Sequence, residues 1–314
     1  MFAHTGLWRG GCLTVASVCG LLTGPALAST PNELTPSEVG STMANSSFGW
    51  RLFAPANSAR ALTPALARGV TYAGSTSAGD AIVIVLSRDG TSVRRISTRF
   101  EATCTDGQDF DQFVDGPSKR AITASGRFEA MASGTDDLGS GVTARKTISL
   151  KAKVKGRRIT GSQRLHVDEV DAAGAIVATC DQTAPFTVIS ARGKVFGGHT
   201  SQGGPVAVEL TATRKAVRQF HIGWQSSCTP SGAIQIGDTL IDFPIASGRF
   251  GDHFTRTISV SRGEKDTLRY SLRGTIKGAR VTGTFRVKAT ETDATGATLA
   301  TCDTGAISYA ASSG

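Results

Sequence analysis

Aromatic residues are scarce in this sequence. They make up 6% of its 314 residues, with 3 Trp and 3 Tyr. Recognition of sugars or bases by stacking needs exposed aromatic platforms. After the first 28 residues only Trp50 and Trp224 remain as tryptophans, and the alternating pattern around Trp224 predicts that it points inward. The composition therefore gives stacking-based recognition little support.

The spacing of a zinc site is also missing. The sequence has no Cys-x-x-Cys pair and no closely spaced pair of histidines. Asp106, Asp109, Asp111 and Asp115 crowd one segment, and hard carboxylate oxygens at this density could hold calcium. Their spacing differs from that of a helix–loop–helix calcium loop, so the segment predicts a solvated acidic loop. We expect no metal and no cofactor.

No segment has the roughly 18 consecutive apolar residues that a membrane span needs. Residues 1–28 instead have the pattern of a secretory signal peptide, with Arg9 ahead of a short apolar run and Ala26-Leu27-Ala28 as the cleavage site. The first two of the 6 cysteines, Cys12 and Cys19, fall within it. We therefore expect an exported protein, extracellular or associated with the cell surface, with no membrane span.

Residues 29–67 differ from the rest of the chain. Four prolines are spread among Ser, Thr, Asn and Ala, and no apolar period of any length appears. Such a composition favours disorder. We predict a disordered lead-in, and the sequence leaves open whether it contacts a partner.

The main feature of the remaining chain is an internal duplication. Residues 155–181, KGRRITGSQRLHVDEVDAAGAIVATCD, return without a gap at residues 277–303 as KGARVTGTFRVKATETDATGATLATCD. The match extends on both sides of this stretch. It predicts two domains, repeat 1 at residues 68–190 and repeat 2 at residues 191–314.

Both repeats alternate apolar and polar residues between glycine-rich turns, and the chain contains 37 Gly. Period two on both sides of a Gly-centred turn is typical of a β-hairpin. Comparison with repeat 2 predicts which side chains of an apolar run in repeat 1 point inward. Val206, Val208 and Leu210 alternate with other residues in repeat 2, and they match Ile82, Ile84 and Leu86 in repeat 1. The sequence predicts an all-β protein of two tandem antiparallel β-sandwiches or small barrels.

Four cysteines follow the signal peptide, and an even number in an exported protein indicates disulfides. Four cysteines allow three pairings. Each repeat holds one cysteine in its first half and one near its end, so we predict one disulfide inside each repeat. The predicted pairs are Cys104–Cys180 and Cys228–Cys302.

Short motifs recur at matching places in the repeats. Thr76-Ser77-x-Gly79 corresponds to Thr200-Ser201-x-Gly203, and Cys180-Asp181 to Cys302-Asp303-Thr304-Gly305. With these motifs the repeat resembles all-β domains of unknown function that recur in secreted proteins of high-GC bacteria. The resemblance covers both repeats. It implies export and β structure, and it carries over no activity and no catalytic residue.

The duplicated hairpin presents basic residues on one face. The formal net charge of the chain is +9, which favours anionic partners. If Leu150 and Val154 point inward, the basic residues between them point outward, and repeat 2 keeps such a face. A cationic face of this kind could bind anionic polymers, and it is also compatible with an ordinary solvated face. The candidate binding residues are Lys151, Lys153, Lys155, Arg158, Arg164, Arg273, Lys277, Arg280, Arg286 and Lys288.

Two of the matched motifs contain half of a nucleophile elbow, with Ser77 and Ser201 in x-Ser-x-Gly. The leading Gly is absent and no helix is predicted to follow, although the elbow requires both. We therefore predict a non-enzymatic structural or binding module without catalytic residues. The alternatives are a binder of anionic cell-wall polymer or acidic polysaccharide, and a secreted hydrolase that uses His199 or His221 in repeat 2.

Overall fold

The computed structural model describes residues 69–139, 141–230, 233–259 and 264–314. Within these ranges the chain forms strands β1 to β17 and no helix, which confirms the predicted all-β class. No described segment is therefore a helix long and apolar enough to cross a membrane. The predicted signal peptide and lead-in lie outside the described residues.

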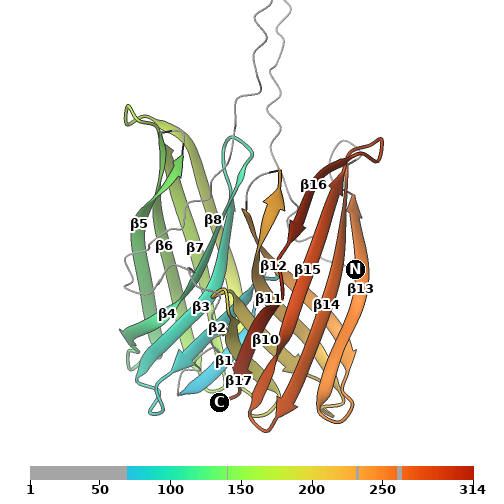
Figure 1. The fold of residues 1–314 in the computed structure, drawn as a ribbon. Helices are drawn as coiled ribbons and strands as arrows, with labels where there is room; N and C mark the ends of the chain where they lie inside the picture. Colours follow the sequence, from blue (N-terminus) through green and yellow to red (C-terminus); the bar gives the residue numbers. More distant parts are fainter. Residues whose placement is uncertain (1–68, 140, 231–232, 260–263) are drawn as a thin grey trace, which may run out of the picture.

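The first eight strands form barrel 1 (Figure 1). Their order in the sheet is β4-β3-β2-β1-β8-β7-β6-β5, and all neighbours are antiparallel. Because β1 pairs with β8, two four-stranded meanders join into one curled, barrel-like sheet whose edges are β4 and β5. The strands are β1 (Val70–Thr76), β2 (Ala81–Leu86), β3 (Ser92–Thr103), β4 (Asp109–Ala121), β5 (Arg127–Gly139), β6 (Val142–Lys155), β7 (Arg158–Val170) and β8 (Ile176–Ile189).

Barrel 2 repeats this arrangement in the order β12-β11-β10-β9-β17-β15-β14-β13. The strand that corresponds to β8 is split in two, so that β16 pairs with β11 and β15 while β17 pairs with β9 and β15. The strands are β9 (Val195–Thr200), β10 (Pro205–Leu210), β11 (Ala216–Thr229), β12 (Ala233–Pro244), β13 (Arg249–Ser259), β14 (Lys265–Lys277), β15 (Arg280–Thr292), β16 (Thr298–Asp303) and β17 (Ile307–Ser312).

Two-residue turns set the register of the duplicated hairpins. Lys155 pairs with Arg158 and Lys277 with Arg280, so Gly156 and Gly278 are the first central residues of their turns. Their φ angles are 57° and 58°, in the left-handed region that glycine adopts without steric cost. A two-residue turn matches the twist of the flanking strands, and this keeps the apolar side chains of both strands on the inner face.

The disulfides close each barrel where its shortest strands end. In barrel 1, β1 and β2 have 7 and 6 residues, whereas β3 and β8 have 12 and 14. Beyond the short strands β3 lies directly against β8, and Cys104 bridges Cys180 there. Cys228 and Cys302 join β11 to β16 in barrel 2. Both predicted disulfides are thus confirmed.

The two barrels pack against each other through their first strands. Val83 and Val85 of β2 lie in one apolar cluster with Val195 and Ala207 of barrel 2. The alternate residues of β2 face the core of barrel 1, so the whole strand is buried. Burial on both faces explains why residues 82–86 are apolar throughout.

Candidate functional site

All ten candidate basic residues are exposed, on β6 and β7 of barrel 1 and on β14 and β15 of barrel 2. Those that lie toward the disulfides are engaged by carboxylates. Arg164 Nη2 is 2.5 Å from Asp181 and Arg286 Nη2 is 2.5 Å from Asp303, each as part of a two-pronged hydrogen bond. These bonds hold the pKa of Asp181 and Asp303 below the usual value.

Two further candidates have weaker partners. Lys288 Nζ is 3.7 Å from Asp303, and Lys151 Nζ is 3.5 Å from Glu129. In each of these four contacts the carboxylate partly neutralises the charge of the basic side chain. These four basic residues therefore attract an external anion less than an unpaired cation would. Arg273 has no carboxylate within 4.0 Å among the described residues.

The residues at the hairpin tips differ from these. Lys153, Lys155 and Arg158 in barrel 1, with Lys277 and Arg280 in barrel 2, form no ion pair with any described carboxylate. Arg158 and Lys155 are cross-strand partners, as are Arg280 and Lys277, so like charges face each other at both tips. Like charges placed directly opposite repel one another, and a bound anion would relieve this repulsion.

The folded chain brings the two tips to the same end of the molecule. Neighbouring strands alternate in direction, so the turns after β6 and β14 lie at corresponding ends of their barrels. Gly314, just after β17, contacts Val70 and Thr71 at the start of β1, so these ends are adjacent. In Figure 1 they form the bottom of the molecule, where the C-terminus also lies.

Other turns at this end add basic residues that the sequence analysis did not include. Arg127 is the cross-strand partner of Lys153, and Arg249 has the matching place in barrel 2. The signal for them was present, because Gly126-Arg127-Phe128 and Gly248-Arg249-Phe250 are duplicated. We call this surface the basic end. Its exposed cations include Arg127, Lys153, Lys155, Arg157, Arg158, Arg192, Arg214, Lys215, Arg249, Lys277 and Arg280.

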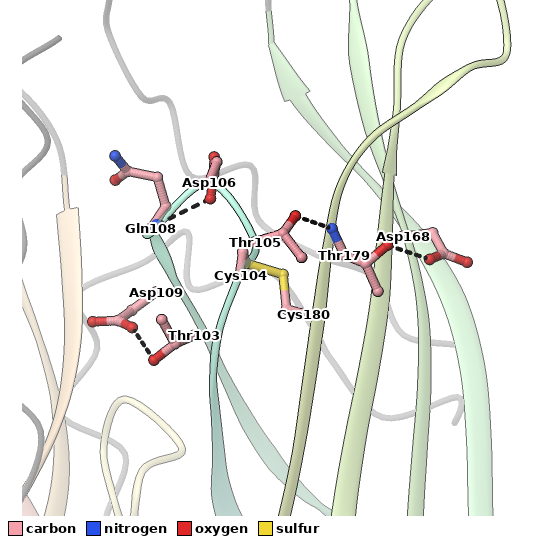
Figure 2. The surroundings of a disulfide bond; sticks show 9 residues. All are labelled: Thr103, Cys104, Thr105, Asp106, Gln108, Asp109, Asp168, Thr179 and Cys180. Carbon is pink, nitrogen blue, oxygen red and sulfur yellow. Dashed lines mark hydrogen bonds between the residues drawn. A yellow bond between two sulfur atoms is a disulfide. The ribbon is translucent and has the colours of Figure 1, made fainter. Parts of the chain in front are cut away.

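The opposite end, which carries the disulfides, is rich in carboxylates. Figure 2 shows Asp106 accepting a hydrogen bond from the backbone of Gln108 and Asp109 accepting one from Thr103, next to the Cys104–Cys180 bridge. Carboxylates therefore gather beside this disulfide, although exposed arginines such as Arg145 and Arg164 also lie toward this end.

The four aspartates of the predicted acidic loop do not converge on a common point. Asp111 pairs with Arg99 at 2.5 Å and Asp115 with Arg95 at 2.5 Å, while Asp106 and Asp109 stay in the turn. Among the described residues one group of three possible ligand side chains lies within 4.8 Å, Cys104, Glu169 and Cys180. Its two sulfurs are joined in the disulfide and are not thiolates, the form of cysteine that binds metals.

The residues of the hydrolase alternative are separated. Ser201 is exposed in the turn between β9 and β10. His221 is buried between the barrels, where its Nδ1 lies 2.8 Å from Thr239 Oγ1 and 3.2 Å from the Gly79 carbonyl oxygen. Burial lowers the pKa of both His199 and His221. Among the described residues no hydrogen bond joins Ser201 to either ring.

Arg99 forms a buried ion cluster beside the barrel interface, which the sequence analysis did not foresee. Its guanidinium contacts Asp80 and Glu101 at 2.8 Å and Asp111 at 2.5 Å. It also donates to the carbonyl oxygen of Gln235 in barrel 2, at 3.4 Å. Burial raises the pKa of Asp111 to about 7, against the opposing effect of Arg99. Both terminal nitrogens of the guanidinium are bonded, and the Nε–H, which has no partner among the described residues, is buried out of reach of solvent, so we read the cluster as part of the packing between the barrels.

Barrel 2 has Gly223 where barrel 1 has Arg99, so the ion cluster is not duplicated. The basic end, by contrast, is built from both repeats, and it is the surface we take as the candidate site. Comparisons of the chain with protein-family models, with curated proteins and with solved structures found no match.

Proposed function

We propose that this is an exported, non-enzymatic binding module whose basic end holds an extended anionic polymer. The polymer class is an acidic polysaccharide or a phosphate-bearing polymer of a cell surface. The observation that supports this is the collection of exposed cations from both barrels at one end, without ion pairs to described carboxylates. The two disulfides are typical of an oxidising compartment, where such polymers occur.

Two neighbouring barrels suit a long ligand better than a small one. A polymer held at one tip reaches the second tip as an intramolecular event, so affinity increases without new kinds of contact. Each neutralised charge also releases counterions, which makes binding depend strongly on salt. Affinity for a single phosphate or sugar acid is expected to be low, because exposed charge pairs in water each contribute little.

Charge removal at the hairpin tips tests the proposal. Retention on immobilised polygalacturonate and on immobilised poly(glycerol phosphate) is measured over a series of salt concentrations. The tip variant should elute at clearly lower salt than the wild type and show a shallower dependence of affinity on salt. The tip variant combines Lys155→Ala, Arg158→Ala, Lys277→Ala and Arg280→Ala.

A matched control removes the same formal charge from the same four strands, nearer the disulfide end. These positions are exposed as well. If total charge alone governed retention, tip and control variants would elute together, and the basic end would be rejected as the site. The control should instead elute close to the wild type. It combines Arg145→Ala, Arg164→Ala, Arg269→Ala and Arg286→Ala.

A further inference from the structure

The interior of barrel 1 is interrupted, whereas that of barrel 2 is continuous. In barrel 2 a single cluster of buried apolar side chains extends from Val217 near the basic end to Cys302 at the disulfide. Barrel 1 has two clusters, one around Ile84 and Leu150 and the other around Phe100 and Leu165. Since the strands of the two barrels correspond, apart from the split of the counterpart of β8 into β16 and β17, we attribute the break to the side chains.

A narrow apolar cleft lies at the level of this break. Its walls belong to β3 and β4 on one side and to β5 and β6 on the other, so it lies along the seam between the edge strands β4 and β5. It encloses a volume of about 20 Å³, close to what a single water molecule requires. Its lining residues include Phe100, Val114, Ala130, Ala132, Ile148 and Leu150.

Barrel 2 fills the corresponding space with its own side chains. Ala132 faces Ile148 across β5 and β6, and at the matching place Phe254 faces Tyr270 across β13 and β14. The rings of Phe254 and Tyr270 are stacked, with centroids 4.7 Å apart and planes inclined by 14°. The fold therefore accommodates a stacked six-membered ring at this position, and barrel 1 has alanine there.

At this level the interior of barrel 1 also contains a polar pair, one residue on β3 and one on β7. Thr98, the cross-strand partner of Val114, donates a hydrogen bond to Gln163 at 2.9 Å, and Gln163 donates to the Arg99 carbonyl oxygen at 2.7 Å. Barrel 2 has Ile222 and Phe285 in place of Thr98 and Gln163, both fully buried. This polar pair interrupts the apolar interior of barrel 1 but does not line the cleft, whose walls are apolar, so the cleft suits an apolar ligand.

We propose that barrel 1 binds a small monocyclic aromatic molecule in this cleft, in the place that the Phe254 ring occupies in barrel 2. The ligand enters between β4 and β5, the only neighbours around barrel 1 that no described ladder of hydrogen bonds joins. Since the cleft is narrow, binding moves these edges apart, which costs no ladder hydrogen bonds. Binding buries apolar surface on the ligand and on both walls.

Toluene serves as the probe, with phenol as its polar counterpart. Binding to the full chain is followed by protein-observed methyl NMR and by the rise in Tm, since a ligand that binds only the folded state stabilises it. The wild type should show saturable binding with resonance shifts at Ile148 and Leu150. Ala132→Phe places in barrel 1 the phenylalanine that barrel 2 has at the matching position. It should raise Tm without ligand and weaken toluene binding at least tenfold.

Met131→Phe is the matched control, because its side chain is 57% exposed on the outer face of the same strand. It adds the same ring outside the barrel and should leave toluene binding unchanged. If Ala132→Phe does not fold by circular dichroism, Ala132→Leu fills part of the cleft and should weaken binding in the same direction. Phe254→Ala should create a second toluene site in barrel 2.

Two results would overturn the proposal. Equal toluene binding by wild type and Ala132→Phe would place the probe elsewhere. A wild type that shows no saturation up to the solubility limit, together with a higher Tm for Ala132→Phe, would make the cleft a packing defect only. Retention on anionic polymers should be the same for all these variants, so this inference and the proposed function can fail separately.

Discussion

Asp266 is a buried carboxyl to which no described residue is hydrogen-bonded. It is 1% exposed at the disulfide end of barrel 2, and neither of its side-chain oxygens has a hydrogen-bond partner among the residues that the structure describes. Other buried charged groups have at least one partner. Asp238, for example, accepts hydrogen bonds from Trp224 and Tyr270 at 2.8 Å and 3.2 Å. Burial, together with the charges of Glu291 and Glu264, raises the pKa of Asp266 to about 6.

We expect Asp266→Ala to stabilise the protein at neutral pH. Alanine is the residue at the matching place in barrel 1, Ala144, and it removes an unsatisfied group that costs about 1–3 kcal/mol. Chemical denaturation at pH 7.5 gives the difference in the free energy of unfolding. A variant that is less stable than the wild type at this pH would show that the carboxylate has a favourable partner.

The same group predicts a pH dependence. Because the pKa of Asp266 is higher in the folded protein, about 6, than its ordinary value of 3.8, folding binds a proton between these values. The wild type should therefore lose stability from this group as pH rises from about 4 to 6, with the full loss present above pH 6. Asp266→Asn, which cannot ionise, should not show this part of the pH profile.

At the scale of the strands, the disulfides join long strands beyond the point where the short strands between them end. Past the ends of β1 and β2, the end of β3 is joined to β8 by the bridge between Cys104 and Cys180 and by hydrogen bonds between Thr105 and Thr179. In barrel 2, β16 extends this contact by pairing with residues on both sides of Cys228. The bridge should therefore matter most for holding barrel 1 closed at its disulfide end.

We expect the double variant Cys104→Ala, Cys180→Ala to lose stability. The bridge closes a loop with a sequence separation of 76, and the chain-entropy model assigns such a loop about 4.5 kcal/mol as an upper figure. Hydrogen exchange should show the loss first in the described residues of β3 and β8 beyond β1. Protection that is unchanged there would mean that the ladder alone holds these strands together.

At the scale of the molecule, the two barrels act as one body because their first strands pack closely. Gly197 marks one close approach, since a Cβ atom at this residue would lie 2.6 Å from Val83 Cγ1 and 2.8 Å from Thr71 Cγ2. Atoms cannot approach so closely, so any side chain here forces the barrels apart. The relative position of the two hairpin tips depends on this contact.

Gly197→Val should therefore separate the barrels while leaving each folded. We expect a larger radius of gyration by small-angle scattering, two unfolding transitions in place of one, and weaker retention on anionic polymers. Thr284→Val, on the exposed outer face of β15, introduces the same valine side chain away from the interface and is the control. A compact Gly197→Val with one transition would show that the contact can adapt.

Much of the fold could be predicted because it depends on local or repeated patterns. The alternation of residues indicates which side chains of a strand share a face, and the duplication selected the disulfide pairs, which the structure confirms. The run from Ile82 to Leu86 shows the limit. Its continuous apolar pattern is compatible with burial on both faces, but nothing within the strand identifies the second barrel as what covers the outer face.

By itself, then, the sequence determined the β class, the inward faces, the hairpin turns and the sulfur bridges, because each follows from neighbours along the chain or from the comparison of two copies. Tertiary structure alone decided that both tips share one end and that Asp111 and Asp115 separate onto Arg99 and Arg95. It also decided that the aromatic side chains fill one barrel and leave a cleft in the other. These features depend on contacts between residues far apart in the chain, where packing, rather than local propensity, sets the distances.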